Sequence, residues 1–347
     1  MERRIGEGGS SQLGTSRILV TGGAGFMGSW LGDELLRRGN EVIVADNLLG
    51  GKEENVNHGC KFVKADLRQR EQVEAIVSDG IDVIFHLAAY AAEGQSVFSP
   101  IAINEINIAP MNNLLVSAVN NGIKRFVFTS SMAVYGDQRP PFSEKLPRRP
   151  EDPYGAAKAY CENVLEIFSR VYGLEYVIVR PHNVYGPKQN IADPYRNVLG
   201  IWLNQIMRGR NPLVYGDGKQ KRAFSYIEDV TPALANAGFY AKAEGQIINL
   251  GGEDAIAINE ACRLIIELTG TTLKPKHVAA RPNEIKYAYC TTEKSKKLLD
   301  YKTRHTLRDG LQKMIEWGHN VGKQEPTYTL PLEITKNAPK VWVDRSI

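Results

Sequence analysis

The chain has 347 residues and a formal net charge of +4, from 43 Lys and Arg against 39 Asp and Glu. Apolar residues make up 43% and charged residues 24%, which excludes a mainly disordered, collagen-like or disulfide-scaffold protein. So small a charge excess does not favour binding to nucleic acid or to an anionic membrane surface. The four cysteines show no CxxC spacing, so we expect no metal site, no disulfide framework and a reduced cytoplasmic setting.

This length predicts two structural units. Residues 1–16 are rich in Gly and Ser and lack the apolar core of a secretion signal, so we expect a flexible leader. No apolar run reaches the ~20 residues that a membrane-spanning helix needs. The membrane is therefore not an expected partner.

The first half of the chain alternates short apolar runs with helical periodicity. We expect strands at residues 17–21, 41–45, 61–63, 83–87, 125–129 and 175–179. The predicted helices between them cover residues 25–38, 71–78, 104–121 and 154–172. Strands that are apolar throughout are typical of a parallel sheet covered by helices on both faces. The pattern predicts an α/β fold with a Rossmann-type, doubly wound parallel sheet over residues 17–180.

After residue 180, Pro and Gly interrupt the pattern more often. We expect a smaller C-terminal α/β substrate domain from residues 181–224 and 251–318, with helices at 259–269, 293–299 and 307–317. A segment near 225–250 is expected to return to the first domain. Residues 319–347 lack helical periodicity and are expected to form an extended tail.

Strand 17–21 leads into the sequence TGGAGFMG, with glycines at 22, 25 and 28. Glycine permits a tight strand-to-helix turn and close approach to a pyrophosphate, and the following helix N-terminus attracts that anion. Asp46 follows Gly25 by 21 residues, where a carboxylate binds ribose hydroxyls and repels a 2′-phosphate. We therefore expect NAD rather than NADP, the alternative being a glycine-rich surface turn. Asp66 is a candidate for the adenine amino group, or else a helix cap.

Tyr154 and Lys158 are spaced i and i+4 on a helix that Asp152 and Pro153 are expected to begin. A phenol has a pKa of ~10, and a neighbouring ammonium favours the phenolate form. Tyr154 is therefore a candidate base for a substrate hydroxyl. The alternative is an ordinary Tyr and Lys on an amphipathic helix, but the glycine loop and Ser131 at the end of strand 125–129 favour catalysis.

The motifs TGGAGFMG, HLAA, TSSMAVYG, YGAAK, RPHNVYGP and RAFSYIEDV together resemble the extended short-chain dehydrogenases, specifically the NAD-dependent nucleotide-sugar epimerase/dehydratase family. The likeness runs from about residue 17 to 317 and is greatest to the UDP-glucose (UDP-galactose) 4-epimerases. It implies Tyr154 as base, Lys158 as its partner and Ser131 as proton relay. The cofactor residues that it implies are Gly22, Gly25, Phe26, Met27, Gly28, Asp46, Asn47, Asp66, Leu67, Leu87, Ala88, Ala89, Asn107, Tyr154 and Lys158.

The same resemblance implies a nucleotide-diphosphate sugar as the substrate, most simply a UDP-hexose, with UDP-N-acetylhexosamines and UDP-hexuronates as alternatives. Asn183 and Asn197 match asparagines on its nucleotide-diphosphate side. Arg222 and Arg281 are candidate diphosphate ligands, since guanidinium offers bidentate donors. Ala288 falls near a position where a large aromatic excludes 2-acetamido sugars, so N-acetylhexosamines are also expected substrates. The resemblance also implies a homodimer, formed through apolar faces of the predicted helices 104–121 and 154–172; the alternative is that these faces pack only within the chain.

The residue after Ser131 separates subclasses of the family. Dehydratases place an acidic pair after the Thr and decarboxylases show TSE, whereas this chain has Met132, which cannot transfer a proton. The resemblance therefore implies 4-epimerisation by transient oxidation at C4. The alternatives are a 4,6-dehydratase or decarboxylase of the same fold, a nucleotide-sugar reductase, and a non-catalytic NAD-binding protein.

Overall fold

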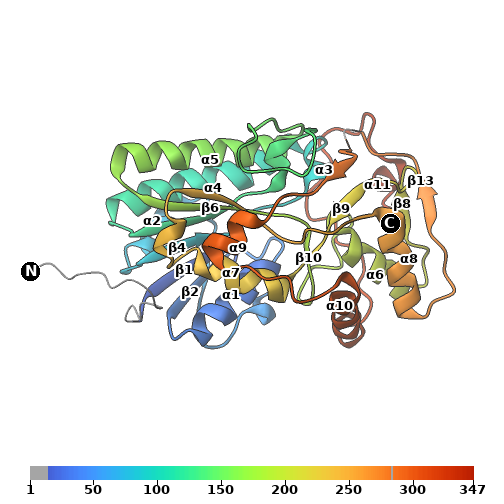
Figure 1. Cartoon of the computed structure of the whole chain (residues 1–347), viewed down its shortest axis with the longest axis horizontal. Coiled ribbons are helices and arrows are strands. Elements are labelled where there is room, and N and C mark those ends of the chain that lie inside the picture. Colours follow the sequence, from blue (N-terminus) through green and yellow to red (C-terminus); the bar gives the residue numbers. More distant parts are fainter. Residues whose placement is uncertain (1–14, 283) are drawn as a thin grey trace, which may run out of the picture.

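The computed structural model describes residues 15–282 and 284–347. A seven-stranded sheet, parallel throughout, forms the first unit in the spatial order β11-β6-β5-β4-β1-β2-β3 (Figure 1). The strands are β1 (Arg17–Thr21), β2 (Glu41–Asp46), β3 (Lys61–Lys64), β4 (Val83–His86), β5 (Arg125–Thr129), β6 (Glu175–Pro181) and β11 (Gln246–Leu250). The predicted Rossmann-type sheet is confirmed.

Helices cover both faces of this sheet, as Figure 1 shows. On one face lie α2 (Arg70–Val77), α4 (Pro100–Asn120) and α5 (Pro153–Tyr172). On the other lie α1 (Phe26–Arg37), α7 (Ile227–Asn236) and α9 (Glu293–Leu299). Alternate residues of each strand enter the two cores, so that Ile18 packs on one face and Leu19 on the other. This two-sided burial explains why the central residues of the inner strands are apolar, whereas the edge strand β3 begins and ends with exposed lysines.

Segment 225–250 returns to the first unit through α7 and β11, because β11 pairs with β6 at the edge of the sheet. The second unit contains α6 (Val198–Met207), α8 (Ile258–Thr269) and α10 (Leu307–Val321) around a core that includes Trp202, Ile265 and Met314. Its short strands are β7 (Val184–Tyr185), β8 (Leu213–Tyr215), β9 (Lys221–Ala223), β10 (Ser225–Tyr226), β12 (Ala255–Ala257), β13 (Lys276–Val278) and β14 (Tyr287–Ala288). No helix among the described residues is long and apolar enough to cross a membrane.

The C-terminal segment differs from the expected extended tail. Helix α10 continues to Val321, and a short helix, α11 (Lys340–Val343), follows later. Between them the chain crosses both units: Glu333 accepts hydrogen bonds from the first backbone N–H groups of α4, and Leu330 is buried. Trp342 is 2% exposed and donates from Nε1 to the Tyr215 hydroxyl at 2.8 Å. The sequence pattern missed this packing because single buried side chains in an irregular segment leave no periodicity.

Candidate active site

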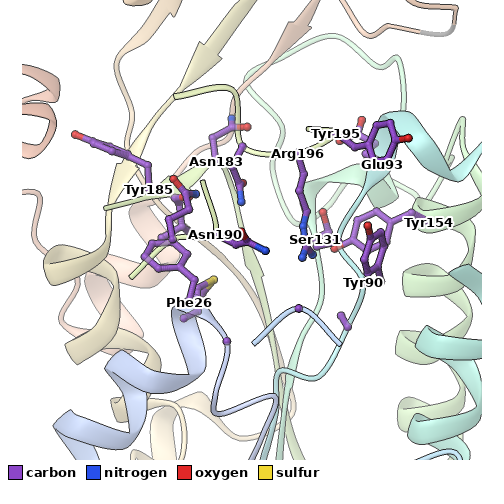
Figure 2. Close-up of a pocket in the computed structure, with 18 of the residues that line it drawn as sticks. Phe26, Tyr90, Glu93, Ser131, Tyr154, Asn183, Tyr185, Asn190, Tyr195 and Arg196 are labelled. Carbon is purple, nitrogen blue, oxygen red and sulfur yellow. The ribbon is translucent and has the colours of Figure 1, made fainter. Parts of the chain in front are cut away.

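A cavity of about 820 Å³ lies between the carboxyl ends of the sheet strands and the second unit (Figure 2). That edge of a doubly wound sheet is where ligands bind in this architecture. The cavity is large enough for a dinucleotide or another extended ligand. It collects every candidate site residue except Asn107, although those residues lie far apart in the chain.

The glycine loop forms one wall, and its packing shows why side chains are excluded there. A Cβ at Gly28 would lie 2.2 Å from the carbonyl oxygen of Gly22, and one at Gly22 would lie 2.7 Å from the backbone of Ala88. Gly22 also has a positive φ of 69°. Helix α1 begins after Gly25 with no side-chain cap, so its first N–H groups are available to an anion. These features fit a pyrophosphate.

Asp46 ends β2 beside this loop and is 8% exposed. Its carboxylate accepts hydrogen bonds from the backbone N–H groups of Ala24 at 3.1 Å and Leu48 at 2.8 Å. Burial raises the pKa of Asp46 above its usual value, while the backbone donors oppose that shift. The carboxylate lines the cavity where the cofactor's ribose is expected. Asp66 lies further along this wall and is paired with Arg68 at 2.6 Å, which lowers its pKa.

The remaining cofactor candidates Phe26, Met27, Asn47, Leu67, Leu87, Ala88 and Ala89 also line the cavity. Asn107 does not. It is buried behind the wall, where its side-chain amide donates to the backbone carbonyl oxygens of Tyr90 and Ile103. The structure therefore gives Asn107 a place in holding the segment after β4, and no direct place on the cavity surface.

Ser131, Tyr154 and Lys158 converge at the end of β5. Asp152 caps α5 by accepting from the Gly155 N–H at 2.8 Å, and Pro153 occupies the first turn, as the sequence predicts. Tyr154 and Lys158 are 6% and 3% exposed. The Lys158 Nζ lies 5.9 Å from the centre of the Tyr154 ring. Figure 2 shows Tyr154 and Ser131 facing the same part of the cavity.

Burial dominates the ionisation of both groups. It raises the pKa of Tyr154 well above its usual value, and hydrogen bonding to Ser131 opposes this shift. Burial also lowers the pKa of Lys158 to about 8, so the ammonium form still predominates at neutral pH. Tyr154 is therefore a proton donor in this state, and a phenolate requires additional positive charge beside it.

Two arginines from the second unit stand on the opposite wall. Arg222 donates to the backbone carbonyl oxygen of Ile285 at 2.7 Å. Arg281 lies over the Tyr215 ring at 5.0 Å and pairs with Glu284 at 2.8 Å. These contacts hold the guanidinium groups in place, as planar bidentate recognition requires.

Asn183 and Asn197 also line the cavity, and both have a positive φ, 44° and 64°. The Asn183 amide donates to the Ala223 carbonyl oxygen, and Asn197 is the residue before α6. Ala288 does not line the cavity: it is 4% exposed in the core beneath it, in β14 opposite Arg222. Its small side chain therefore does not open space for a sugar substituent directly.

Two charged residues near Tyr154, Arg196 and Glu93, line the cavity but were not identified from the sequence motifs. Arg196 pairs with Asp193 at 2.6 Å and lies over the Tyr90 ring at 4.5 Å, and Glu93 is the first residue of α3 (Glu93–Ser96). Figure 2 shows Arg196 projecting toward Ser131. The only sequence signal was a charge beside a motif: Glu93 six residues after Leu87 of HLAA, and Arg196 directly before Asn197. Among the described residues, no cluster of three or more His, Cys, Asp and Glu could hold a metal ion.

A Rossmann-type sheet, a glycine-lined pyrophosphate cradle and a Tyr–Lys pair beside it define a dinucleotide-dependent oxidoreductase-type site. Residues 18–251 match the NAD dependent epimerase/dehydratase family, and the chain belongs to that family. NAD is therefore its cofactor, in agreement with the acidic residue at the end of β2.

Individual relatives cover nearly the whole chain. A UDP-N-acetyl-alpha-D-glucosaminuronate decarboxylase from Bacillus cytotoxicus is 34% identical over 87% of this chain and 97% of the relative. The UDP-glucose 4-epimerase of Thermotoga maritima, solved with UDP-glucose, is 34% identical with a TM-score of 0.83, covering 88% of this chain and 99% of its own. The Thermus thermophilus UDP-glucose 4-epimerase, solved with NAD, is 32% identical with a TM-score of 0.82, covering 87% and 98%.

Proposed function

We propose that the protein is an NAD-dependent nucleotide-sugar 4-epimerase that acts on a UDP-hexose. The observation that carries this proposal is the convergence of Ser131 and Tyr154 with a neutral side chain, Met132, at the end of β5. Tyr154 supplies a base for proton transfer at one substrate hydroxyl. The end of β5 lacks the carboxylate that dehydratases and decarboxylases place after the Ser or Thr. The UDP-glucose 4-epimerase relatives support the same reaction.

In the proposed mechanism, NAD, when bound, takes up and returns the hydride of C4. Tyr154 accepts the proton of the C4 hydroxyl and, after the 4-keto sugar has turned, returns it to the C4 oxygen; C4 is inverted because its opposite face would then meet the cofactor. Lys158 keeps positive charge beside the phenol, and the Ser131 hydroxyl relays the proton between the sugar oxygen and Tyr154. Because burial, with smaller effects of Glu93 and Asp152, raises the pKa of Tyr154, these polar neighbours and the charged cofactor must together produce the base.

Inversion requires the 4-keto sugar to turn over while the rest of the substrate stays bound. Arg222 and Arg281, with Asn183 and Asn197, are proposed to hold the nucleotide diphosphate at the wall of the second unit. The diphosphate carries the charge that two guanidinium groups recognise, whereas the hexose ring is neutral. Firm binding at one end therefore leaves the sugar free to rotate at the other.

The test is proton NMR of the purified protein with catalytic NAD and, in separate tubes, UDP-glucose, UDP-N-acetylglucosamine and UDP-glucuronate. The proposal requires anomeric signals of a C4 epimer with no net NADH. A 4-keto-6-deoxy product, or loss of C6 as carbon dioxide, would replace it by the lyase alternative. Stoichiometric NADH would replace it by a dehydrogenase or reductase.

We also propose that the protein acts as a homodimer in the cytoplasm. Exposed apolar side chains gather on two neighbouring helices, α4 and α5: Ile101, Val116, Tyr160, Ile167, Val171 and Tyr172. Val171 is 60% exposed and Tyr172 58%, and apolar side chains that gather on one face in this way mark interaction sites. A second copy would cover the same helices through a two-fold axis. The four cysteines are free thiols, in keeping with a reducing compartment.

A further inference from the structure

Glu93 introduces a negative charge into the part of the cavity where the sugar must lie. It is exposed to the cavity and begins α3, immediately beside the catalytic helix α5. The Ser96 hydroxyl fixes this arrangement, because it bonds both to the Glu93 carbonyl oxygen at 2.7 Å and to the Asp152 carboxylate at 3.1 Å. Asp152 is the N-cap of the helix that carries Tyr154.

The other side of α3 faces the proposed diphosphate ligands. A Cβ placed on Gly94 would lie 3.1 Å from Nη1 of Arg281 and 3.4 Å from the Trp342 ring. The field of Glu93 also reaches both ends of the sugar site. Its charge contributes an upward shift to the pKa values of Tyr154 and Asp152 on one side and of Arg222 and Arg281 on the other. Burial is the larger effect in each case and leaves the pKa of Arg222 below its usual value, and Glu284 acts more strongly than Glu93 on the pKa of Arg281. A hexose held between Tyr154 and the two arginines must therefore pass beside Glu93.

Most of the nearby cations already have partners. Arg222 lies 3.9 Å from the Glu284 carboxylate and within the field of Glu93, and it is proposed to bind the substrate diphosphate. Arg196 is paired with Asp193 at 2.6 Å, and Arg281 is paired with Glu284 at 2.8 Å. Lys158 lies behind the Tyr154 ring and donates to the Thr129 carbonyl oxygen at 2.9 Å. Asp152 lies in the same wall, but burial and the charge of Glu93 raise its pKa to about 7, so it is only partly ionised at neutral pH. Glu93 is therefore the carboxylate that brings negative charge to this side of the sugar site.

We propose that Glu93 is a specificity-determining residue that selects UDP-hexoses with neutral sugars and rejects UDP-hexuronates. This inference rests on the proposed epimerase function. A carboxylate accepts hydrogen bonds from the hydroxyls of a neutral hexose, whereas it repels a carboxylate at C6. Two like charges about 5 Å apart at an effective dielectric near 20 repel strongly enough to reduce binding by about 100-fold or more.

Epimerisation should discriminate against UDP-hexuronates more strongly than binding alone, because the sugar must fit the site in two orientations. When the 4-keto sugar turns about its diphosphate link, the side bearing C6 and the side bearing C2 and C3 exchange places. A residue on one lateral wall therefore meets C6 in one of the two orientations, whichever epimer binds first. Glu93 would oppose a hexuronate either on entry or after rotation.

The experiment compares kcat/KM for UDP-glucose and UDP-glucuronate in the wild type, Glu93→Gln, Glu93→Asp and Glu71→Gln. The wild type should favour UDP-glucose at least 100-fold. Glu93→Gln keeps the size of the side chain and should shift this ratio at least 30-fold toward UDP-glucuronate, while Glu93→Asp keeps the charge and the preference. Glu71 is an exposed carboxylate on α2, and its variant should leave the ratio unchanged.

Equal turnover of both sugars by the wild type, or an unchanged ratio in Glu93→Gln, would overturn the inference and leave the epimerase function standing. If no variant epimerised any sugar, the proposed function would fail instead. Calorimetric binding of the two UDP-sugars to the NAD-loaded protein then decides the role of Glu93 separately. Removal of the charge must strengthen UDP-glucuronate binding at least 10-fold relative to UDP-glucose, and a smaller change refutes the inference.

Discussion

Lys158 donates a hydrogen bond from Nζ to the carbonyl oxygen of Thr129, 2.9 Å away, at the end of the strand that carries Ser131. This bond joins helix α5 to the carboxyl end of β5, so the base and the proton relay are positioned by the same contact. The ammonium group is 3% exposed and also lies 4.8 Å from the centre of the Phe128 ring. A charge buried this deeply is costly to the fold, and its retention points to a role in the reaction.

Replacing Lys158 by Met should abolish activity and stabilise the fold. Burial lowers the pKa of Lys158 from 10.5 to about 8, so below pH 8 the folded protein pays for keeping it charged. At pH 7 this cost lowers the free energy of unfolding by up to about 3 kcal/mol. The gain in the variant should be smaller than this, because the variant also loses the hydrogen bond to Thr129. The unfolded state binds more protons between pH 8 and 10.5, so wild-type stability rises there. Urea unfolding should therefore show a gain for the variant at pH 7 that fades by pH 10.5, and no gain at pH 7 would contradict this account.

Replacing Tyr154 by Phe should reduce kcat by about 10³-fold or more, because the variant lacks the hydroxyl that is proposed to accept the C4 proton. The variant keeps the ring in its buried place, so NAD binding and thermal stability should change little. Ser131→Ala should cost less, about 10- to 100-fold, since Tyr154 can still act without the relay. The two variants are compared by NMR turnover of UDP-glucose. Equal losses would mean that Ser131 and Tyr154 act as one unit.

Replacing Arg281 by Met should raise KM for the nucleotide sugar at least 10-fold with a smaller change in kcat. Its guanidinium is proposed to bind the diphosphate, which is held alike before and after the sugar turns. Arg263 is exposed on α8, outside the cavity lining, so Arg263→Met serves as the control. A fall in kcat alone would place Arg281 at the reacting sugar instead.

His86→Phe should make stability less sensitive to acid. His86 is 1% exposed, and burial followed by the charge of Lys158 lowers its pKa from 6.5 to about 3. Below pH 6.5 the unfolded state therefore binds a proton that the folded state does not, and stability falls as the pH falls. Between pH 7 and pH 5, His86 should lower the free energy of unfolding of the wild type by about 2 kcal/mol. Urea unfolding at pH 7 and pH 5 should therefore show a smaller fall in the free energy of unfolding for the variant than for the wild type, by that amount.

Val171→Glu should dissociate the proposed dimer. Val171 is 60% exposed near the end of α5, where a second copy would bury it and the new carboxylate would lack a partner. Sedimentation velocity should give a dimer for the wild type and a monomer for the variant. Val343→Glu, 46% exposed on α11, is the matched control and should remain dimeric. A monomeric wild type would remove this proposal.

Much of the fold could be predicted because its signals are local. The strands of the sheet have apolar central residues, and Gly22 and Gly28 of the loop stand where a Cβ would collide with backbone. The position of Asn107 could not be predicted in this way. A polar residue on a predicted helix can face the cavity or lie buried behind its wall, and the sequence does not distinguish the two. Glu93 and Arg196 reach the cavity through irregular segments, whose course depends on tertiary packing. In the sequence, the signal for Glu93 and Arg196 was a charged residue close to a recognised motif.

The packing of Trp342 has a consequence for how the protein is made. A ribosome delivers the chain from its N-terminus, so the glycine cradle and the Tyr154 helix are available long before residue 342 emerges. Until then Tyr215 lacks its indole partner, and Arg281, which lies over the Tyr215 ring, has one wall of its pocket open. A truncated product that stops before Trp342 would carry a complete cofactor half and an unfinished substrate half. The wall beside Arg281 is therefore completed only after residue 342 has been synthesised.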